Sequence, residues 1–464
     1  MTEKNEMLPK MWQVLFVLGG FLVLAFIFIS SGIGVQLALF GGWFLAFAVG
    51  KSMGMAYADM EKAAIKGIAN GMNAILILLT VGALIGTWIS GGIVPSFIYY
   101  GLQTIHPSIF LLATLLITSI TSLTTGTSWG SAGTAGIAMM GIGAGLGMPP
   151  ALTAGAVLSG AYFGDKLSPV SDSTILTATM SNVDVIDHVK AMIPVTVPAY
   201  VITSIAFTIV GFRYSDGAAD LSQVETVMGS ISTIFNVNLF SLIPMALIIA
   251  LLVMKKPAIP VIAFGAFLGV VWGVVFQGLP ATVALTTAWA QIPQDTGLEF
   301  IDNILSRGGM ASMLGSLVII IFGLGFGGLL GEIGVLKKLT RVLLDKWVTN
   351  AGTASVATII TGFFGNFFGS GMYVALILTP KIMSEKIDEL GLDRRVLSRN
   401  SEFGSTLTSG MVPWSDNGVY MAGILGVSTL EYLPFMWLAF SCIIISIIYG
   451  FTNRFLYDSV MKES

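Results

Sequence analysis

The feature that most constrains the fold is a long run without charge, since residues 67–164 contain no Asp, Glu, Lys or Arg. A helix needs about 20 apolar residues to cross the hydrocarbon core of a bilayer, and stretches of that length recur along the chain. Strands of a membrane barrel would instead alternate over roughly ten residues. Only 10% of the 464 residues are charged, against about 25% in soluble domains. The sequence therefore predicts an all-α polytopic membrane protein.

Charge and cysteine content exclude several other classes of protein. The formal net charge is -3, and the basic residues are scattered rather than gathered in a patch, so no nucleic-acid partner is expected. A single cysteine, Cys442, excludes an intramolecular disulfide and a Cys-based metal cluster. The apolar stretch after the polar residues 1–10 lacks a small-residue cleavage site, which predicts a retained first helix. No bound cofactor is expected.

Apolar runs predict about ten spans and two segments of a different kind. The expected spans are residues 11–30, 32–50, 72–90, 150–181, 192–212, 235–254, 257–277, 310–331, 400–427 and 433–454. The segment 352–380 lies between two basic stretches, 337–346 and 381–395, which the positive-inside rule places in the cytoplasm. We therefore expect a re-entrant hairpin at 352–380 and a second one at 108–148.

The positions of Lys and Arg then predict the orientation in the membrane. With the hairpins in place, all of these residues lie on one side except Lys166, Arg213 and Arg307. Lys166 falls inside the membrane, and the two arginines fall in loops rich in acidic residues. This bias predicts a multi-pass protein of the cell membrane with both termini in the cytoplasm.

The expected topology contains an inverted repeat. The first copy comprises 72–90, 108–148, 150–181 and 192–212, and the second comprises 310–331, 352–380, 400–427 and 433–454. The copies share Pro-x-Ser-Asp in "SPVSDS" (168–173) and "VPWSDN" (412–417), and "GTSWGSAG" (126–133) resembles "GNFFGSGM" (365–372). Inverted repeats are typical of secondary transporters.

The repeat divides the chain into four expected segments. They are scaffold helices of the first repeat (1–56), its interfacial segment, hairpin and broken helix (57–212), outside loops with scaffold helices of the second repeat (213–309), and the hairpin, broken helix and last span of that repeat (310–464).

Two spans are expected to be broken in mid-membrane. Pro169 and Pro413 interrupt them, and a helix break in hydrocarbon survives only where the freed backbone groups meet protein, water or an ion. The hairpin tips, 124–136 and 362–371, are rich in glycine, hydroxyl and amide groups. A tip beside a break therefore offers a cluster of oxygens in each repeat, as small hard cations require.

Three aspartates lie in or beside these breaks. Asp165 and Asp172 flank Pro169, and Asp416 follows Pro413 in the matching motif. Acidic groups inside a membrane are costly and are usually functional. We predict that they bind Na+ or H+, with Asp172 and Asp416 as the main carriers and Asp165 as the next candidate.

Neighbouring polar residues have both a functional and a structural interpretation. Lys166 is expected to pair with Asp165, which would leave Asp172 as the freer carboxylate, although the aspartates at the half-helix starts could also be helix caps. Glu402 lies near Arg399, so a salt bridge is as plausible as a role in the ion pathway. Hydroxyl and amide groups near the breaks and tips could bind ions or their own helix backbone. These residues are Thr127, Ser128, Ser168, Ser171, Thr174, Asn366, Ser415 and Asn417.

Other residues carry weaker expectations. His106 and His188 fall in predicted loops and are expected to be exposed, with pH sensing by His188 as the less favoured alternative. Trp129 and Trp414 adjoin a tip and a break and could seal an ion site from water. The segment 334–347 is apolar on one face and basic on the other, which predicts an interfacial helix.

Several of these stretches together resemble the NhaC family of Na+/H+ antiporters. They are "GTSWGSAGT", "GAYFGDKLSPVSDSTIL", "DVIDHV" and "SEFGSTLTSGMVPWSDNGVYMAGILGV", which occur in this order over most of the chain. The resemblance implies an ion-transporter-superfamily fold with inverted repeats and two re-entrant hairpins. It also implies exchange of Na+ against H+, with some members coupling organic acids such as malate and lactate to these ions.

The expected mechanism is competition between Na+ and H+ for a buried carboxylate in an alternating-access cycle. The expected partners are Na+, H+, Li+ or small organic acids, the lipid bilayer and a second copy in a homodimer. An organic-acid antiporter of the same fold is the main alternative, although no unpaired membrane Arg is visible that could clamp a dicarboxylate. Broken helices favour alternating access over a channel. The sequence contains no HExxH motif and no convincing pair of nucleophile and base, so an enzyme is not expected.

Overall fold

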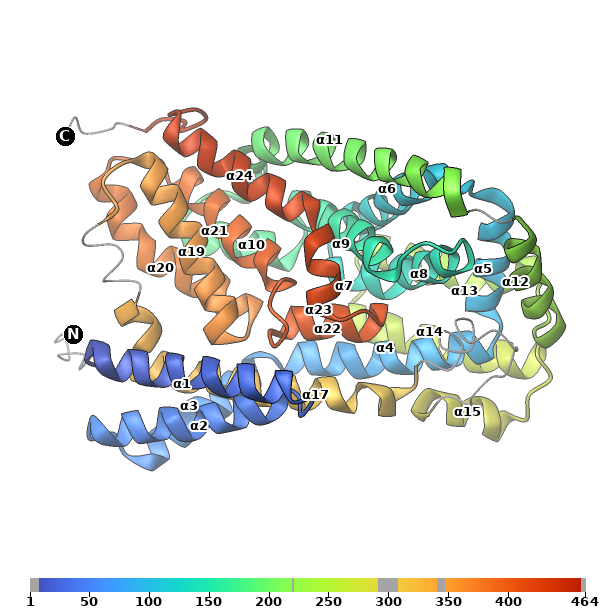
Figure 1. Cartoon of the computed structure of the whole chain (residues 1–464), viewed down its shortest axis with the longest axis horizontal. Coiled ribbons are helices and arrows are strands. Elements are labelled where there is room, and N and C mark those ends of the chain that lie inside the picture. The colour runs from blue at the N-terminus through green and yellow to red at the C-terminus, as the bar shows by residue number, and fades with distance from the viewer. Residues whose placement is uncertain (1–7, 219–220, 291–307, 340–346, 460–464) are drawn as a thin grey trace.

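The computed structural model describes residues 8–218, 221–290, 308–339 and 347–459, and within these ranges the chain is helical with no β-strand (Figure 1). Eight helices are long and apolar enough to cross a membrane, or up to 10 if each of two bent helix pairs counts as one span. The bent pairs are Val224–Ile234 with Leu239–Val253, at 96°, and Thr429–Phe435 with Trp437–Phe451, at 56°. The predicted all-α polytopic fold is confirmed.

The first half of the chain supplies the following elements. They are α1 (Met11–Ser30), α2 (Val35–Ser52), α3 (Tyr57–Asn70), α4 (Met72–Ser90), α5 (Ile93–Thr104), α6 (Pro107–Thr125), α7 (Ser128–Ser131), the π-helix η1 (Ala132–Gly136), α8 (Ile137–Gly145), α9 (Pro150–Leu167), α10 (Asp172–Ser181) and α11 (Val185–Ala218).

The second half repeats the order of long helix, hairpin, broken helix and final span. Its elements are α12 (Leu221–Ile234), η2 (Leu239–Leu242), α13 (Ile243–Val253), α14 (Ala258–Val275), α15 (Ala281–Trp289), η3 (Met310–Met313), α17 (Leu314–Ile333), α19 (Ala351–Gly369), α20 (Met372–Glu389), α21 (Arg394–Ser409), α22 (Asp416–Leu425), α23 (Thr429–Tyr432), η4 (Leu433–Phe435) and α24 (Trp437–Phe451).

Both breaks fall at the predicted prolines. The first span stops at α9 and resumes as α10 after the link 168–171, which contains Pro169. The second stops at α21 and resumes as α22 after the link 410–415, which contains Pro413. Proline lacks a backbone N–H and its ring blocks the preceding turn, so a helix ends before it unless neighbours compensate.

The hairpins turn inside the predicted tips, through residues with left-handed backbone. Gly126 has φ 71° between α6 and α7, and Ser370 has φ 54° between α19 and α20. Each hairpin packs against the first half of the broken helix in its own repeat, α6 on α9 and α19 on α21. The turns are thereby brought to the helix breaks.

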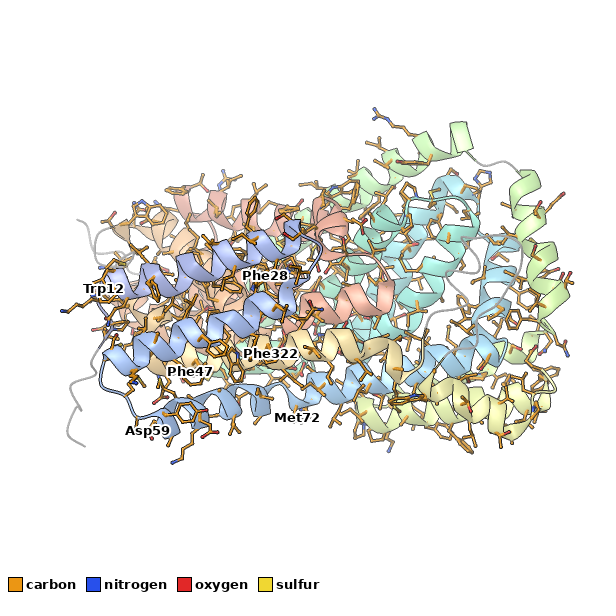
Figure 2. The ribbon with its side chains drawn as sticks, turned by 60° about the horizontal axis from the view of Figure 1, so that its bottom comes forward. Trp12, Phe28, Phe47, Asp59, Met72 and Phe322 are labelled. Atoms are coloured by element: carbon orange, nitrogen blue, oxygen red, sulfur yellow. The ribbon has the colours of Figure 1, made fainter. Side chains whose placement is uncertain are left out.

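A separate group of helices, α1 to α3, packs along one side of these elements. Helices α1 and α2 pack on each other, and α2 and α3 pack on α17. Figure 2 shows α1 and α2 side by side, with Trp12 and Phe28 near the two ends of α1. Large apolar side chains on this surface are exposed, with Phe26 at 75% and Trp12 at 59%, which suits contact with lipid chains.

The structure corrects one span and adds helices that were expected to be loops. Helix α11 begins at Val185 rather than 192, because the Asp184 carboxylate accepts a hydrogen bond from Ile186 N at 2.8 Å and caps the helix. The short helices α5, α12 and α15 were not expected. Of the predicted interfacial helix 334–347, residues 335–339 are helical, and 340–346 lie outside the described residues.

Candidate functional site

The first candidate ion site lies where the turn of the first hairpin meets the break between α9 and α10. Asp165, in the last turn of α9, is 2% exposed. Ser128 Oγ donates to Asp165 Oδ2 at 2.6 Å, and Ser171 Oγ donates to Asp165 Oδ1 at 2.5 Å. Hydrogen bonds of this length to a carboxylate are strong. Asp165 is therefore fixed between the hairpin turn and the helix break.

The turn itself is built for this close approach. A Cβ at Gly126 would lie 2.9 Å from Val170 Cγ2, so glycine suits both the backbone angle and the space. Thr127 caps α7 with its hydroxyl. Ser168 Oγ donates to Leu123 O at 3.3 Å. The hydroxyl group of Thr127 thus holds the backbone of its own short helix, whereas that of Ser168 ties the link to α6.

The second candidate site has the same construction in the other repeat. Asp416 is 1% exposed and is the first residue of α22. Its Oδ1 accepts hydrogen bonds from Asn417 N at 2.7 Å and from Met372 N at 3.1 Å, and its N–H donates to Ser370 O at 3.0 Å. The turn of the second hairpin therefore contacts the break between α21 and α22.

The other predicted residues of this site also come together. Ser415 Oγ donates to Ser409 O at 2.5 Å and caps α22. Asn417 Nδ2 donates to Ser409 Oγ at 2.6 Å, and Asn366 Nδ2 donates to Ser405 O at 2.6 Å. Side-chain amides from the hairpin and the half-helix thus tie both elements to the end of α21.

Several buried oxygens around the second site make no hydrogen bond in the described part of the chain. These are Asn366 Oδ1, Ser370 Oγ, Ser405 Oγ and Asn417 Oδ1. Buried polar atoms are normally satisfied, so each of these oxygens is open to a ligand. No group of three or more His, Cys, Asp and Glu that could hold a metal ion occurs among the described residues.

Asp172 differs from the other two aspartates because its side chain is exposed. Tyr373 at the start of α20 donates its hydroxyl to Asp172 Oδ2. Because α10 belongs to the first repeat and α20 to the second, this hydrogen bond joins the repeats. We therefore rank the buried Asp165 and Asp416 above Asp172 as candidate ion carriers.

Lys166 does not neutralise Asp165, so that prediction is wrong. Successive helical residues point about 100° apart, and the two side chains leave α9 in different directions. Lys166 is fully buried, its Nζ lies 3.2 Å from Cys442 Sγ, and it lies 4.7 Å from the centroid of the Phe403 ring. No salt bridge of Asp165 or Lys166 occurs within the residues described here. The charge of Asp165 is thus uncompensated by a neighbouring cation.

Arg399 corrects two further expectations. It is fully buried, donates from Nη1 to Phe455 O at 3.1 Å, and makes no salt bridge with Glu402, because its side chain extends to the C-terminal residues. Its Nε and Nη2 have no hydrogen-bond partner in the described ranges. A buried Arg with free donors therefore exists, contrary to the expectation that none is available.

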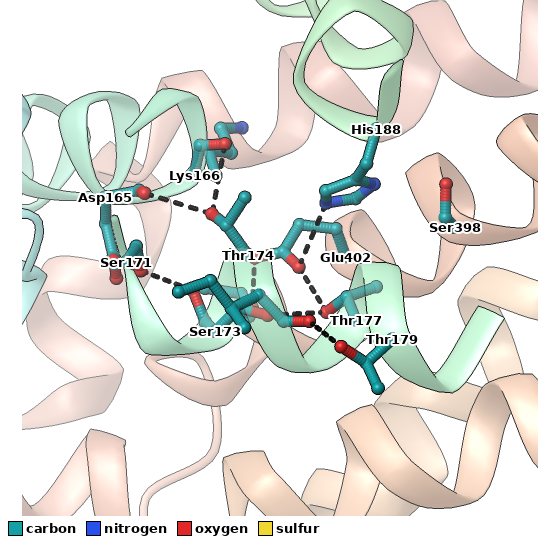
Figure 3. Close-up of polar contacts among 12 residues, drawn as sticks. Asp165, Lys166, Ser171, Ser173, Thr174, Thr177, Thr179, His188, Ser398 and Glu402 are labelled. Carbon is teal, nitrogen blue, oxygen red and sulfur yellow. Dashed lines mark hydrogen bonds and ion pairs between the residues drawn. The ribbon is translucent and has the colours of Figure 1, made fainter. Parts of the chain in front are cut away.

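His188 is not exposed, and it contacts Glu402. Both side chains are 0% exposed, and His188 Nε2 lies 3.8 Å from Glu402 Oε2 (Figure 3). His188 falls inside α11 because that helix begins earlier than predicted. His106, by contrast, is exposed as expected and caps α6.

The two predicted sealing tryptophans are buried. The Trp129 ring stacks on Tyr420 of α22 with centroids 4.1 Å apart, and Tyr420 donates its hydroxyl to Trp129 O at 2.9 Å. Trp414 Nε1 donates to Phe367 O at 2.6 Å, and its ring packs edge-on against Phe21 of α1. Trp129 thus joins the repeats, and Trp414 joins the second break to α1.

Sequence reasoning missed four residues in or near these sites: Thr177, Ser370, Tyr373 and Tyr420. Ser370 had a usable signal, since a polar residue between glycines in a predicted tip is a candidate for left-handed backbone. The other three had none, because their contacts depend on how the repeats pack.

Comparisons with known proteins show which family the chain is similar to. A family model described as "Na+/H+ antiporter family" matches residues 4–196 and 160–454. The chain is 57% identical over 455 residues to the "Malate-2H(+)/Na(+)-lactate antiporter" of Bacillus subtilis (strain 168), covering 98% of this chain and 97% of that protein. It is 34% identical to the "Na(+)/H(+) antiporter NhaC" of Alkalihalophilus pseudofirmus, covering 88% of each chain. It is 30% identical to the "Arginine/ornithine antiporter ArcD" of Halobacterium salinarum, covering 99% of this chain and 95% of that protein.

These relatives are antiporters, and the matched residues include both hairpins and both broken helices. With a polytopic helical fold and a family model that covers most of its length, the chain belongs to the Na+/H+ antiporter family.

Proposed function

We propose that this chain is a secondary active antiporter of the cell membrane that exchanges Na+ against H+ at Asp165 and Asp416, and that it moves small hydroxycarboxylates such as malate and lactate in the same cycle. The observation that carries the ion exchange is the setting of Asp165. Its carboxylate is buried, accepts hydrogen bonds from Ser128 and Ser171, and has no basic partner in the described residues.

A buried carboxylate without a cation is unfavourable, so it must bind either a proton or a metal cation. Na+ and H+ therefore compete for the same oxygens. If the site turns from one side of the membrane to the other only when occupied, one ion is exchanged for the other. Hydroxyl and amide oxygens near Asp416 offer further ligands for the cation.

The organic-acid part of the proposal rests on the relative from Bacillus subtilis, whose name includes malate and lactate and which matches over nearly its full length. The buried cations support it as well. Lys166 and Arg399 have no salt-bridge partner among the residues described, and either could balance the charge of a carboxylate substrate.

The chain ends support the expected orientation. The start of α1 and the end of α24 lie at the same end of the molecule (Figure 1). An arrangement with both termini in the cytoplasm agrees with this and with the distribution of Lys and Arg.

Transport in proteoliposomes tests the proposal. We expect an outward Na+ gradient to drive H+ uptake, and lactate with Na+ on one side to exchange for malate with H+ on the other. Exchange that proceeds equally without either acid would reduce the function to Na+/H+ antiport. Absence of any Na+ dependence would refute the ion exchange.

A further inference from the structure

A second buried titratable pair lies apart from the three aspartates. Glu402 of α21 and His188 of α11 face each other, with Nε2 and Oε2 3.8 Å apart and neither side chain exposed. Figure 3 shows the pair beside Thr177 of α10. The pair therefore lies where α10 and α11 of the first repeat meet α21 of the second.

The carboxylate of Glu402 is held on both oxygens. Thr177 Oγ1 donates to Oε2 at 2.5 Å, and Thr406 Oγ1 donates to Oε1 at 2.7 Å. His188 is less well satisfied, since neither Nδ1 nor Nε2 makes a hydrogen bond to the described residues. The distance to Glu402 is one of an ion pair and is longer than a hydrogen bond.

Net charge decides what the pair binds. With a neutral imidazole and an ionised carboxylate the pair carries a charge of about -1 in a low-dielectric interior, which is unfavourable. One added proton makes the pair neutral, whether it resides on the imidazole or on the carboxylate. The ring nitrogens of His188, which have no hydrogen-bond partner among the described residues, and the carboxylate of Glu402 are the two places where this proton can reside.

No basic side chain from the surrounding elements replaces that proton in the described structure. Arg399 of α21 extends toward Phe455, and Lys190 of α11 pairs with Asp187 at 3.6 Å on the exposed side. Other titratable or charged groups occur on the helices packed around the pair. They are Tyr162, Asp165 and Lys166 of α9, Asp172 of α10, Tyr200, Arg213 and Tyr214 of α11, Tyr373, Lys381, Glu385, Lys386, Asp388 and Glu389 of α20, Arg394 and Arg395 of α21, and Cys442 and Tyr449 of α24.

We propose that Glu402 and His188 form a proton-binding site that is separate from the aspartate sites and carries one H+ per transport cycle. This inference rests on the proposed antiport. The pair takes up H+ from one aqueous side and releases it to the other, and no other bond forms or breaks. Because α10 and α21 both contact it, rearrangement of the two broken helices would change its access to water.

Two measurements test the site. The chain contains two histidines, so histidine-labelled protein gives two NMR signals, and His106→Gln identifies the one from His188. We expect the His188 signal to respond to pH, because the pair gains and loses a proton, and we expect this response to change in Glu402→Gln. In proteoliposomes, Glu402→Gln and His188→Gln should each lower the H+ moved per Na+ by one while Na+-for-Na+ exchange continues. Glu385→Gln, at an exposed position on α20, is the matched control.

The outcomes separate the two proposals. A His188 signal that ignores pH, or an unchanged number of H+ per Na+ in both variants, overturns the proton site. A pH-responsive His188 in protein that moves no Na+ against H+ overturns the proposed antiport and leaves the proton-binding pair in place. If Glu402→Gln does not fold, Thr177→Val tests the site instead, because it keeps both titratable groups. Thr177→Val should keep the number of H+ moved per Na+ and should shift the pH dependence of exchange. An unshifted pH dependence counts against the site.

Discussion

At the scale of single residues, Asp165 has the sharpest test. In Asp165→Asn the hydroxyl groups of Ser128 and Ser171 keep a partner of the same shape, but the negative charge that attracts Na+ and H+ is lost. We expect pH-dependent Na+ exchange to fall by at least about 100-fold in vesicles, which corresponds to a loss of ~3 kcal/mol, the scale of one hydrogen-bonded charge.

The exposed Asp59→Asn is the control for Asp165→Asn and should exchange normally. Asp172→Asn distinguishes the two carriers of the first repeat. Full exchange in Asp165→Asn together with its loss in Asp172→Asn would restore Asp172 as the main carrier.

Ser370 makes a second prediction at this scale. Its hydroxyl is buried without a partner in the described chain, and its backbone has φ 54°, which suits glycine better than serine. Ser370→Gly should therefore leave the Na+-free protein as stable or more stable by up to about 1 kcal/mol. If the hydroxyl is a Na+ ligand, the half-saturating Na+ concentration for exchange should rise several-fold.

Thermal unfolding in detergent and Na+-dependent exchange give the two readouts for Ser370→Gly. Ser312→Gly is a matched control, because the Ser312 hydroxyl already donates to Gly309 O at 2.8 Å. An unchanged Na+ dependence in Ser370→Gly would exclude that hydroxyl as a ligand.

At the scale of elements, the turn of the first hairpin is the position least tolerant of a side chain. Gly126→Ala would place a Cβ on left-handed backbone and 2.9 Å from Val170 Cγ2 in the helix break. We expect a loss of about 1–2 kcal/mol in stability from the backbone alone, together with weaker exchange because Ser128 and Asp165 are pushed apart. Gly315→Ala, where no atom lies within 4 Å of the added Cβ, should be neutral or stabilising.

The elements that carry chemistry were also those that could be predicted from the sequence. Pro169 and Pro413 in apolar runs leave few alternatives to a broken helix, and glycines between apolar helices mark the turns. The start of α11 was missed because one Asp184 cap outweighs the apolar pattern, and this error placed His188 in a loop.

Contacts between distant elements could not be predicted in this way. The direction of Lys166 away from Asp165 follows from the packing of α9 against α21 and α24, which no local pattern records. The hydrogen bond from Tyr373 to Asp172 likewise depends on the arrangement of the two repeats.

At the scale of the whole molecule, the residues after α24 fold back and hold the starts of α11 and α21. Tyr457 donates its hydroxyl to Ala191 O at 2.9 Å, and Arg395 bridges Asp393 at 2.8 Å and Asp458 at 2.6 Å. Partial burial alone would raise the pKa of Asp393, but hydrogen bonds from the side chain and backbone of Arg395 outweigh it and hold that pKa below its usual value.

This clamp predicts a pH-dependent stability. A carboxylate with a lowered pKa stabilises the fold above the pKa of the unfolded chain, about 3.9, and loses that contribution as pH falls through the folded value. Asp393→Asn should still cap α21 but should unfold more easily at neutral pH, by less than about 1 kcal/mol for a partly exposed pair. The difference from the natural protein should shrink as pH falls below about 3.9 and vanish once pH is below the pKa of Asp393 in the folded protein. Measuring the free energy of unfolding of both proteins across this pH range checks the prediction. A difference between them that persists in acid would contradict the electrostatic cause.

Two of the contacts that join the repeats differ in burial. Trp129 and Tyr420 form a buried stack, whereas Tyr373 and Asp172 share an exposed hydrogen bond. A carrier whose repeats are joined by unlike contacts has no reason to open at the same rate toward both faces of the membrane. We therefore expect exchange to be faster in one direction than in the other, although the net driving force is the same in either direction. The half-saturating Na+ concentrations at the inner and outer faces should then differ.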